Sequence, residues 1–168
     1  MNRAWLGLGG NLGDPIKAMS KVLRSLDGRD DTTVRAVSPV YMTPPWGKTD
    51  QPAFKNACAE IATTLSPQQL LRVGLDIELE LKRERLERWG PRVIDVDILV
   101  YEGIGVLEEP ELTLPHPRMT ERAFVLVPLA DIAPDLVVGG LSIAEWASRS
   151  DASGIERITP GDEWWQSG

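Results

Sequence analysis

Two kinds of hydrophobic spacing alternate along the first hundred or so residues, and their order constrains the fold more than any other feature. Apolar residues recur at helical spacing after Pro15 and again after Pro67. β-branched residues or strict alternation, both typical of strands, mark four other segments: residues 4–9, 32–43, 53–63 and 94–101. The predicted element order is strand, helix, strand, strand, helix, strand.

Residues at the boundaries of these segments support the assignment. Asp14 is a typical N-cap residue, and Pro15 suits the first helical position after it. Ser66 and Gln69 have the spacing of a capping box at the start of the second helix. Pro39 removes a hydrogen-bond donor within residues 32–43, so we expect an edge strand or a break there.

This order predicts an α+β protein with the ferredoxin-like βαββαβ arrangement, in which two helices cover one face of an antiparallel sheet. We expect the first and fourth strands to lie together at the middle of the sheet. A length of 168 residues suits a single domain over 1–168. Residues 148–168 form a Gly- and polar-rich tail, whose Trp164 and Trp165 could pack on the body, mediate a contact or be disordered.

Composition and charge restrict the class of function. Apolar residues make up 42% of the chain and charged residues 26%, as in ordinary globular proteins. No segment suits a membrane span or a secretory signal, so we expect a cytoplasmic protein, with the lone Cys58 in its core. A net charge of -7 argues against nucleic-acid or membrane partners, although residues 82–92 carry a local charge of +3.

The segment RWGPRVIDVDILVY, residues 88–101, places two acids on one side of a predicted strand. Asp95 and Asp97 are separated by one residue, so their carboxylates point the same way and repel one another unless a cation lies between them. Oxygen-only ligands favour Mg²⁺, which takes one or two carboxylates together with substrate phosphates. Ordinary salt bridges to Arg88 and Arg92 are the alternative, and a D-x-D pattern by itself favours them. The neighbouring arginines strengthen the metal hypothesis, because guanidinium groups match phosphate oxygens.

Four other features bear on the location of a site. The loop PPWGKTDQP, residues 44–52, is long enough to suggest a function. The turn GLGGNLGD lacks the pattern of a P-loop or a Rossmann motif, so we expect it to serve packing or close backbone approach. His116, between two prolines, has Arg118 and Arg122 nearby as further phosphate donors, and Asn56 on a strand requires hydrogen-bond partners.

Over about residues 4–137 the chain resembles the 6-hydroxymethyl-7,8-dihydropterin pyrophosphokinase family. Five motifs carry the resemblance: GGNLGD, YMTPPWG, QPAFKNA, RERLERWGPRVIDVDILVY and LPHPRMTERAFVLVPLADIAP. The resemblance implies a ferredoxin-like fold and transfer of a diphosphate from ATP to the hydroxymethyl group of the pterin. AMP would be released, in a step of folate biosynthesis.

Positions that match the family's motifs imply the site residues. Two Mg²⁺ ions would be bound by Asp95 and Asp97. The groups acting in the transfer would be Arg83, Arg85, Arg92, Asp95 and Asp97. ATP would contact Arg85, Trp89, Arg92, Ile98, Thr113, His116 and Arg122. The pterin would contact Thr43, Pro44, Trp46, Phe54, Asn56 and Phe124.

The resemblance also implies two mobile loops, and three positions of this chain differ from the family's pattern. Residues 44–52 and 82–92 would be loops that close on ATP and pterin, with Arg88 in a structural role. Gly10 stands where the family commonly has serine, and Lys82 stands where a glycine often precedes the two arginines. Leu75 replaces a glutamine that commonly helps to hold the nucleotide, which argues against that contact here.

Two alternatives belong to other classes. A ferredoxin-like sheet could bind nucleic acid, but paired acids and overall acidity oppose this. A magnesium-dependent nucleotide hydrolase would share the acids without needing a pterin pocket. We expect a monomer that acts on small molecules.

Overall fold

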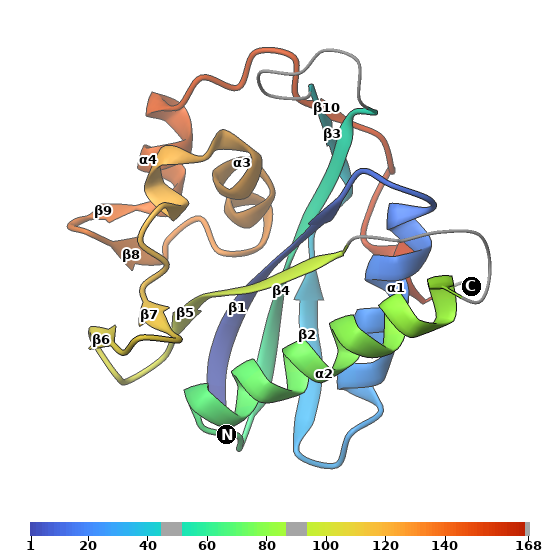
Figure 1. Cartoon of the computed structure of the whole chain (residues 1–168). Coiled ribbons are helices and arrows are strands. Elements are labelled where there is room, and N and C mark those ends of the chain that lie inside the picture. Colours follow the sequence, from blue (N-terminus) through green and yellow to red (C-terminus); the bar gives the residue numbers. More distant parts are fainter. Residues whose placement is uncertain (45–51, 87–93, 167–168) are drawn as a thin grey trace.

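The computed structural model describes residues 1–44, 52–86 and 94–166, with the backbone alone at 83–86 (Figure 1). The elements that build the sheet and its first pair of helices are β1 (Asn2–Gly10), α1 (Pro15–Asp27), β2 (Thr32–Val37), β3 (Tyr41–Thr43), β4 (Phe54–Thr63), α2 (Pro67–Leu86) and β5 (Asp95–Tyr101). The later elements are β6 (Leu107–Glu108), β7 (Thr113–Leu114), η1 (Met119–Glu121), α3 (Ala123–Ile132), β8 (Val137–Val138), β9 (Leu141–Ser142), α4 (Ile143–Arg149), β10 (Glu156–Arg157) and η2 (Glu163–Trp165). The predicted order of strands and helices is confirmed.

The main sheet is antiparallel, with strand order β10-β3-β4-β1-β5, and β2 also pairs with β4. The expectation that the first and fourth predicted strands share the middle is wrong. β5 does pair with β1, but it lies at the edge, and the middle pair is β1 with β4. Each crossover through a helix joins two parallel strands and leaves room for one strand between them, which sends β5 outward.

Helices cover both faces of the sheet, whereas the sequence pattern predicted them on one. α1 and α2 pack over a core that contains Leu23, Ile61 and Leu70 (Figure 1). On the opposite face, α3 and α4 enclose a second core with Leu126 and Ile143. α3 escaped prediction because its sequence, AFVLVPLADI, is apolar except for Asp131 and contains a proline, so it shows no helical periodicity.

Alternation along β4 is confirmed, but along β5 it fails. On β4, Ile61 belongs to the first core while Cys58, predicted to be a core residue, is buried in the second. On β5 the pairing with β1 shifts register between Trp5 and Leu6, which is a β-bulge. Because of the bulge, Leu99 and Val100 both face the second core, whereas strict alternation would send them to opposite faces.

Local signals at the element boundaries are confirmed. The Asp14 carboxylate accepts a hydrogen bond from the Lys17 backbone N–H at 3.1 Å and so caps α1. Ser66 and Gln69 form a reciprocal capping box, with distances of 2.9 and 3.1 Å. The predicted break at Pro39 separates β2 from β3, both of which pair with β4.

The basic segment after α2 differs from expectation. Residues 82–86 were predicted to belong to a loop over 82–92, but α2 continues through Leu86. Lysine, arginine, glutamate and leucine are strong helix formers, and no glycine or proline interrupts them before Gly90. The remainder of that loop, and residues 45–51 of the other, lie outside the described residues.

The tail packs on the body, which is one of the three alternatives considered. The Trp164 indole N–H donates to the Ser38 carbonyl at 2.8 Å, and the Ser20 hydroxyl donates to the Trp165 carbonyl at 2.7 Å. Both tryptophans are partly buried against the first core. Within residues 1–44, 52–86 and 94–166, no helix is long and apolar enough to cross a membrane.

Candidate active site

Two glycines of β1 form the floor of the candidate site. Gly9 pairs with Asn56 on one side and Asp95 on the other, and Gly7 pairs with Cys58 and Asp97. A Cβ built on Gly9 would lie 2.4 Å from the Asn56 Oδ1 atom, closer than real Cβ contacts allow. Glycine is therefore required here for close approach within the strand, and not only for the turn that follows.

A cavity of about 600 Å³ lies above this floor, on the face of the sheet covered by α3. Seven predicted site residues line it, namely Thr43, Phe54, Asn56, Asp95, Asp97, Arg122 and Phe124. These residues come from β3, β4, β5 and the start of α3, so the sheet register and α3 together assemble them. Arg118, considered above as a phosphate donor, also lines the cavity, as do Gly7, Gly9 and Glu121, which were not predicted.

One end of the cavity is aromatic and carries an amide. Asn56 is buried, and its side-chain N–H donates to the Thr43 hydroxyl at 3.0 Å. Phe54 and Phe124 are half-buried in the cavity wall, and the Arg122 guanidinium lies 5.7 Å from the centre of the Phe124 ring. A flat, polar-edged ring suits such a lining, because the rings offer stacking faces and the amide offers hydrogen bonds.

The other end of the cavity carries the two acids. Asp95 as a whole residue is exposed, yet partial loss of hydration raises the pKa of its carboxyl group, and the Asp97 carboxylate raises it further. The ammonium group of Lys82 acts in the opposite direction. Repulsion between the two acids is therefore only partly balanced by the described residues, as expected of a pair that binds a cation.

Glu78 is a third acid that the pattern analysis missed. It is half-buried on α2, and its carboxylate accepts a hydrogen bond from the Val96 backbone N–H at 3.3 Å, on the open edge of β5. Burial, followed by the charges of Asp95 and Asp97, raises the pKa of Glu78 to about 7. Nothing in its helical segment marks Glu78, and only its place beside the D-x-D strand distinguishes it.

His116 lies near Asp97 and is held by two hydrogen bonds. Its backbone N–H donates to the Leu99 carbonyl at 2.8 Å, and its Nδ1 atom accepts from the Arg118 backbone N–H at 3.2 Å. Burial lowers the pKa of His116, and the charges of Arg122 and Arg118 lower it further, against an opposing effect of Asp97. The imidazole is therefore mainly neutral near pH 7.

Among the remaining predicted residues, those whose side chains are described do not line the main cavity. Thr113 is half-buried on β7, and the Ile98 side chain is buried in the first core, so only the Ile98 backbone could contact a ligand. Pro44 lines a smaller cavity beside Thr43 and Phe124. Arg83 and Arg85 lie on α2 with only their backbone described, and the residues outside the described ranges are Trp46, Trp89 and Arg92.

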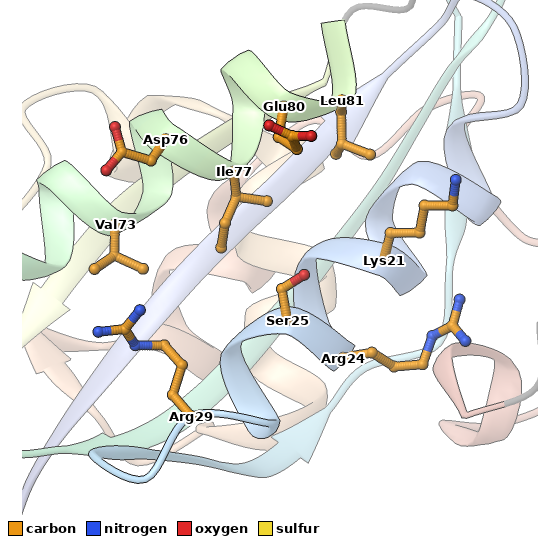
Figure 2. A pocket seen from close by; sticks show the side chains of 9 residues that line it. All are labelled: Lys21, Arg24, Ser25, Arg29, Val73, Asp76, Ile77, Glu80 and Leu81. Carbon is orange, nitrogen blue, oxygen red and sulfur yellow. The ribbon is translucent and has the colours of Figure 1, made fainter. Parts of the chain in front are cut away.

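A further cavity, of about 480 Å³, lies between α1 and α2 (Figure 2). Lys21 and Arg24 of α1 contribute cations to it, while Asp76 and Glu80 of α2 contribute acids. None of the predicted site residues with a described side chain lines this cavity. Its opposite charges, and its place on the other face of the sheet, separate it from the candidate site.

The donor set of the candidate site fits magnesium. The carboxylates of Asp95 and Asp97 offer oxygen atoms only, which Mg²⁺ prefers. No cluster of three or more metal-binding side chains occurs in the described part of the chain. Two carboxylates agree with an ion whose other ligands are water and substrate phosphates.

The fold and cavity define a class: an α+β enzyme whose paired carboxylates face a pocket walled by aromatic rings. The model of the 7,8-dihydro-6-hydroxymethylpterin-pyrophosphokinase (HPPK) family matches residues 5–134. The chain belongs to this family. It is a pyrophosphokinase, a diphosphotransferase of folate biosynthesis.

Relatives named 2-amino-4-hydroxy-6-hydroxymethyldihydropteridine pyrophosphokinase match nearly the whole chain. The relative from Methylorubrum extorquens is 52% identical, with 94% of this chain and 99% of the relative covered. The relative from Pseudomonas aeruginosa is 43% identical, with 96% and 99% covered. The ferredoxin-like expectation for the fold is thus confirmed by family as well as by topology.

A solved structure of Plasmodium falciparum HPPK-DHPS has a similar fold. Its TM-score is 0.68 at 16% identity, and the match covers 88% of this chain. The chain spans 41% of the Plasmodium chain. At this identity the likeness concerns the fold alone.

Proposed function

We propose that the 600 Å³ cavity binds 6-hydroxymethyl-7,8-dihydropterin at its aromatic end and the ATP phosphates across Asp95 and Asp97. Diphosphate passes from ATP to the hydroxymethyl oxygen, and AMP leaves. The observation that carries the proposal is that one cavity joins Asn56, Phe54 and Phe124 to the two acids. An acceptor alcohol and a polyphosphate bound in this way would share one enclosure.

Pterin recognition follows from the aromatic end. The pterin is flat and has a guanine-like edge, so the Asn56 amide and the adjoining Thr43 pair with its donors and acceptors. Phe54 and Phe124 enclose its two faces. Pro44 and Trp46 complete the set of proposed pterin contacts.

The acids serve the phosphates. Asp95 and Asp97 would hold two Mg²⁺ ions, and bound Mg²⁺ neutralises phosphate charge and polarises the attacking hydroxyl. The chain itself would supply alignment: Gly9 leaves room for the Asn56 amide beside β1, and the paired carboxylates would hold the ions that bind the phosphates. No described side chain stands out as a general base, which suits phosphoryl chemistry driven by positioning and charge.

Arginines and a histidine would bind the phosphates from the remaining sides. Arg122 lines the cavity, and the neutral His116 can donate a hydrogen bond without adding charge. Arg83, Arg85 and Arg92 would close on the phosphates from the α2 side. The other proposed ATP contacts are Trp89, Ile98 and Thr113.

We further propose a cytoplasmic monomer that acts on small molecules, with neither nucleic acid nor membrane as a partner. A net charge of -7 supports the absence of nucleic-acid and membrane partners, because an acidic surface repels nucleic acids and anionic lipids.

AMP formation tests the proposed function. With Mg²⁺ and ATP present, AMP should appear only when hydroxymethyldihydropterin is added. A nucleotide hydrolase would consume ATP without the pterin, and a nucleic-acid-binding module would form no product at all. Either result would refute the proposal.

Replacing one acid tests the assignment of the metal ligands. We expect D95N and D97N each to lower turnover by at least about a hundredfold, because metal and phosphate lose a charged ligand. Their melting temperatures should stay at or above the wild-type value, since the change removes repulsion between acids. The matched control is D135N, at an exposed position after α3, which should retain full activity. Near-wild-type turnover in D95N or D97N would contradict the assignment.

A further inference from the structure

The carboxyl-terminal strap, which we define as residues 151–166, runs along the outer edge of β3. In β10, Arg157 pairs with Tyr41 and Glu156 pairs with Met42. The Ile158 backbone N–H donates to the Val40 carbonyl at 2.9 Å, and the Val40 N–H donates to the Thr159 hydroxyl at 2.9 Å. The strap therefore fixes β3 immediately before the residues that enter the candidate site.

Gly154 of the strap lies directly against Pro44. It has φ of +80°, and a Cβ built on it would lie 2.9 Å from the Pro44 Cγ atom and 3.4 Å from Cδ. A proline ring has little freedom to move aside, because its φ is fixed by the ring. Any side chain at position 154 must therefore displace Pro44 or the strap itself.

Displacement of Pro44 would reach the pterin end of the main cavity. Pro44 follows Thr43, the hydroxyl of which accepts the Asn56 hydrogen bond at 3.0 Å. A small cavity of about 140 Å³ is lined by Pro44, Thr43 and Phe124 together with Ser153 of the strap. Thr43 and Phe124 also line the main cavity, so the two spaces share a wall.

We propose that the strap is a positioning element of the pterin site, and that Gly154 sets the place of the Thr43–Pro44 wall by direct packing on Pro44. This rests on the proposed function, since it assumes that pterin occupies the aromatic end. The strap lies beyond the residues that match the family model, 5–134. Gly154 touches no substrate and acts through Pro44.

Two glycine substitutions provide a matched test. G154A and G140A both place alanine at a positive φ, +80° and +88°, so their backbone strain is alike. Nothing lies within 4 Å of the Cβ position at Gly140, in contrast to Gly154. We expect G154A to weaken pterin binding by about tenfold, the effect of one misplaced hydrogen bond with its packing, and to leave binding of a nonhydrolysable ATP analogue unchanged. G140A should change neither.

Calorimetric titration with each ligand separates the outcomes. The inference would be overturned if G154A bound pterin as tightly as the wild type does. Equal losses of affinity for pterin and for the ATP analogue would overturn it as well. A wild-type protein that fails to bind pterin would instead refute the proposed function. In a P44A background, G154A should carry no further penalty, because the ring it displaces is gone; an undiminished penalty there would also overturn the inference.

Folding of the variant is checked by its melting temperature. Should G154A fail to fold while G140A folds, T159V carries the same test, because it deletes the acceptor for the Val40 N–H. A loss confined to pterin binding supports the inference, and unchanged pterin binding in T159V overturns it.

Discussion

At the scale of single residues, Gly9 determines whether the Asn56 amide can stay in place. A Cβ at Gly9 would lie 2.4 Å from Asn56 Oδ1, whereas a Cβ at Gly7 would meet the Leu99 side chain at a tolerable 3.4 Å. We expect G9A to lower pterin affinity by about tenfold or more, and G7A to have a clearly smaller effect. Titration calorimetry with hydroxymethyldihydropterin measures both, and equal effects would mean that Asn56 does not depend on Gly9.

Physical reasoning about single residues identified part of the candidate site. Asp95 and Asp97 could be identified from the sequence because a strand has a two-residue period. Asn56 could be identified because a buried amide needs hydrogen-bond partners. Glu78 could not be identified, since its role depends on the strand and acids that the tertiary fold sets beside it. The individual roles of the site residues stay predictions.

At the scale of elements, the contact between α2 and β5 should make stability depend on pH. The pKa of Glu78 is about 7 in the folded protein against 4.5 ordinarily, so folding favours its protonated form. The resulting stabilisation is full below about pH 4.5 and is lost as pH rises through about 7. Asp95 and Asp97 reinforce the shift, and Lys82 opposes it.

We expect the melting temperature of the ligand-free wild-type protein to fall between pH 5 and pH 8 by more than that of E78Q. The glutamine keeps an acceptor for the Val96 N–H but cannot ionise. E111Q, at an exposed position before β7, serves as the control and should follow the wild type. Parallel curves for E78Q and wild type would show that Glu78 does not titrate in this range.

The elements themselves were predictable where local chemistry decides them. Asp14, Ser66 and Gln69 marked helix starts because capping groups must satisfy free N–H groups. The bulge in β5 and the apolar helix α3 could not be predicted, because neither produces a recognisable hydrophobic periodicity in the sequence. The helical continuation through residues 82–86 was missed because the family resemblance implied a loop over 82–92, although lysine, arginine, glutamate and leucine favour a helix.

At the scale of the whole molecule, bound ligands should stabilise the fold. With Mg²⁺ and an ATP analogue at about a hundred times its Kd, we expect about 2.7 kcal/mol of stabilisation. For a chain of this size that corresponds to a rise in melting temperature of about 5–10 °C. Chelation of Mg²⁺ should abolish the rise from the nucleotide. A rise that persists after chelation would mean that the nucleotide binds without the metal.

The order of elements along the chain was sufficient to predict the fold class but not the order of strands within the sheet. The two crossovers through α1 and α2 each straddle one strand, which places β4 between β1 and β2 and β1 between β4 and β5. That consequence of crossover geometry, and the burial of the second face by α3 and α4, arise only when all elements are assembled.

The hydrogen bond between Ser20 and Trp165 brings the end of the strap to α1, on the face of the sheet opposite the cavity. A tether or a fluorescent label joined past that point would start from the rear of the molecule. Protein immobilised in this way should leave its substrate entrance open to solution.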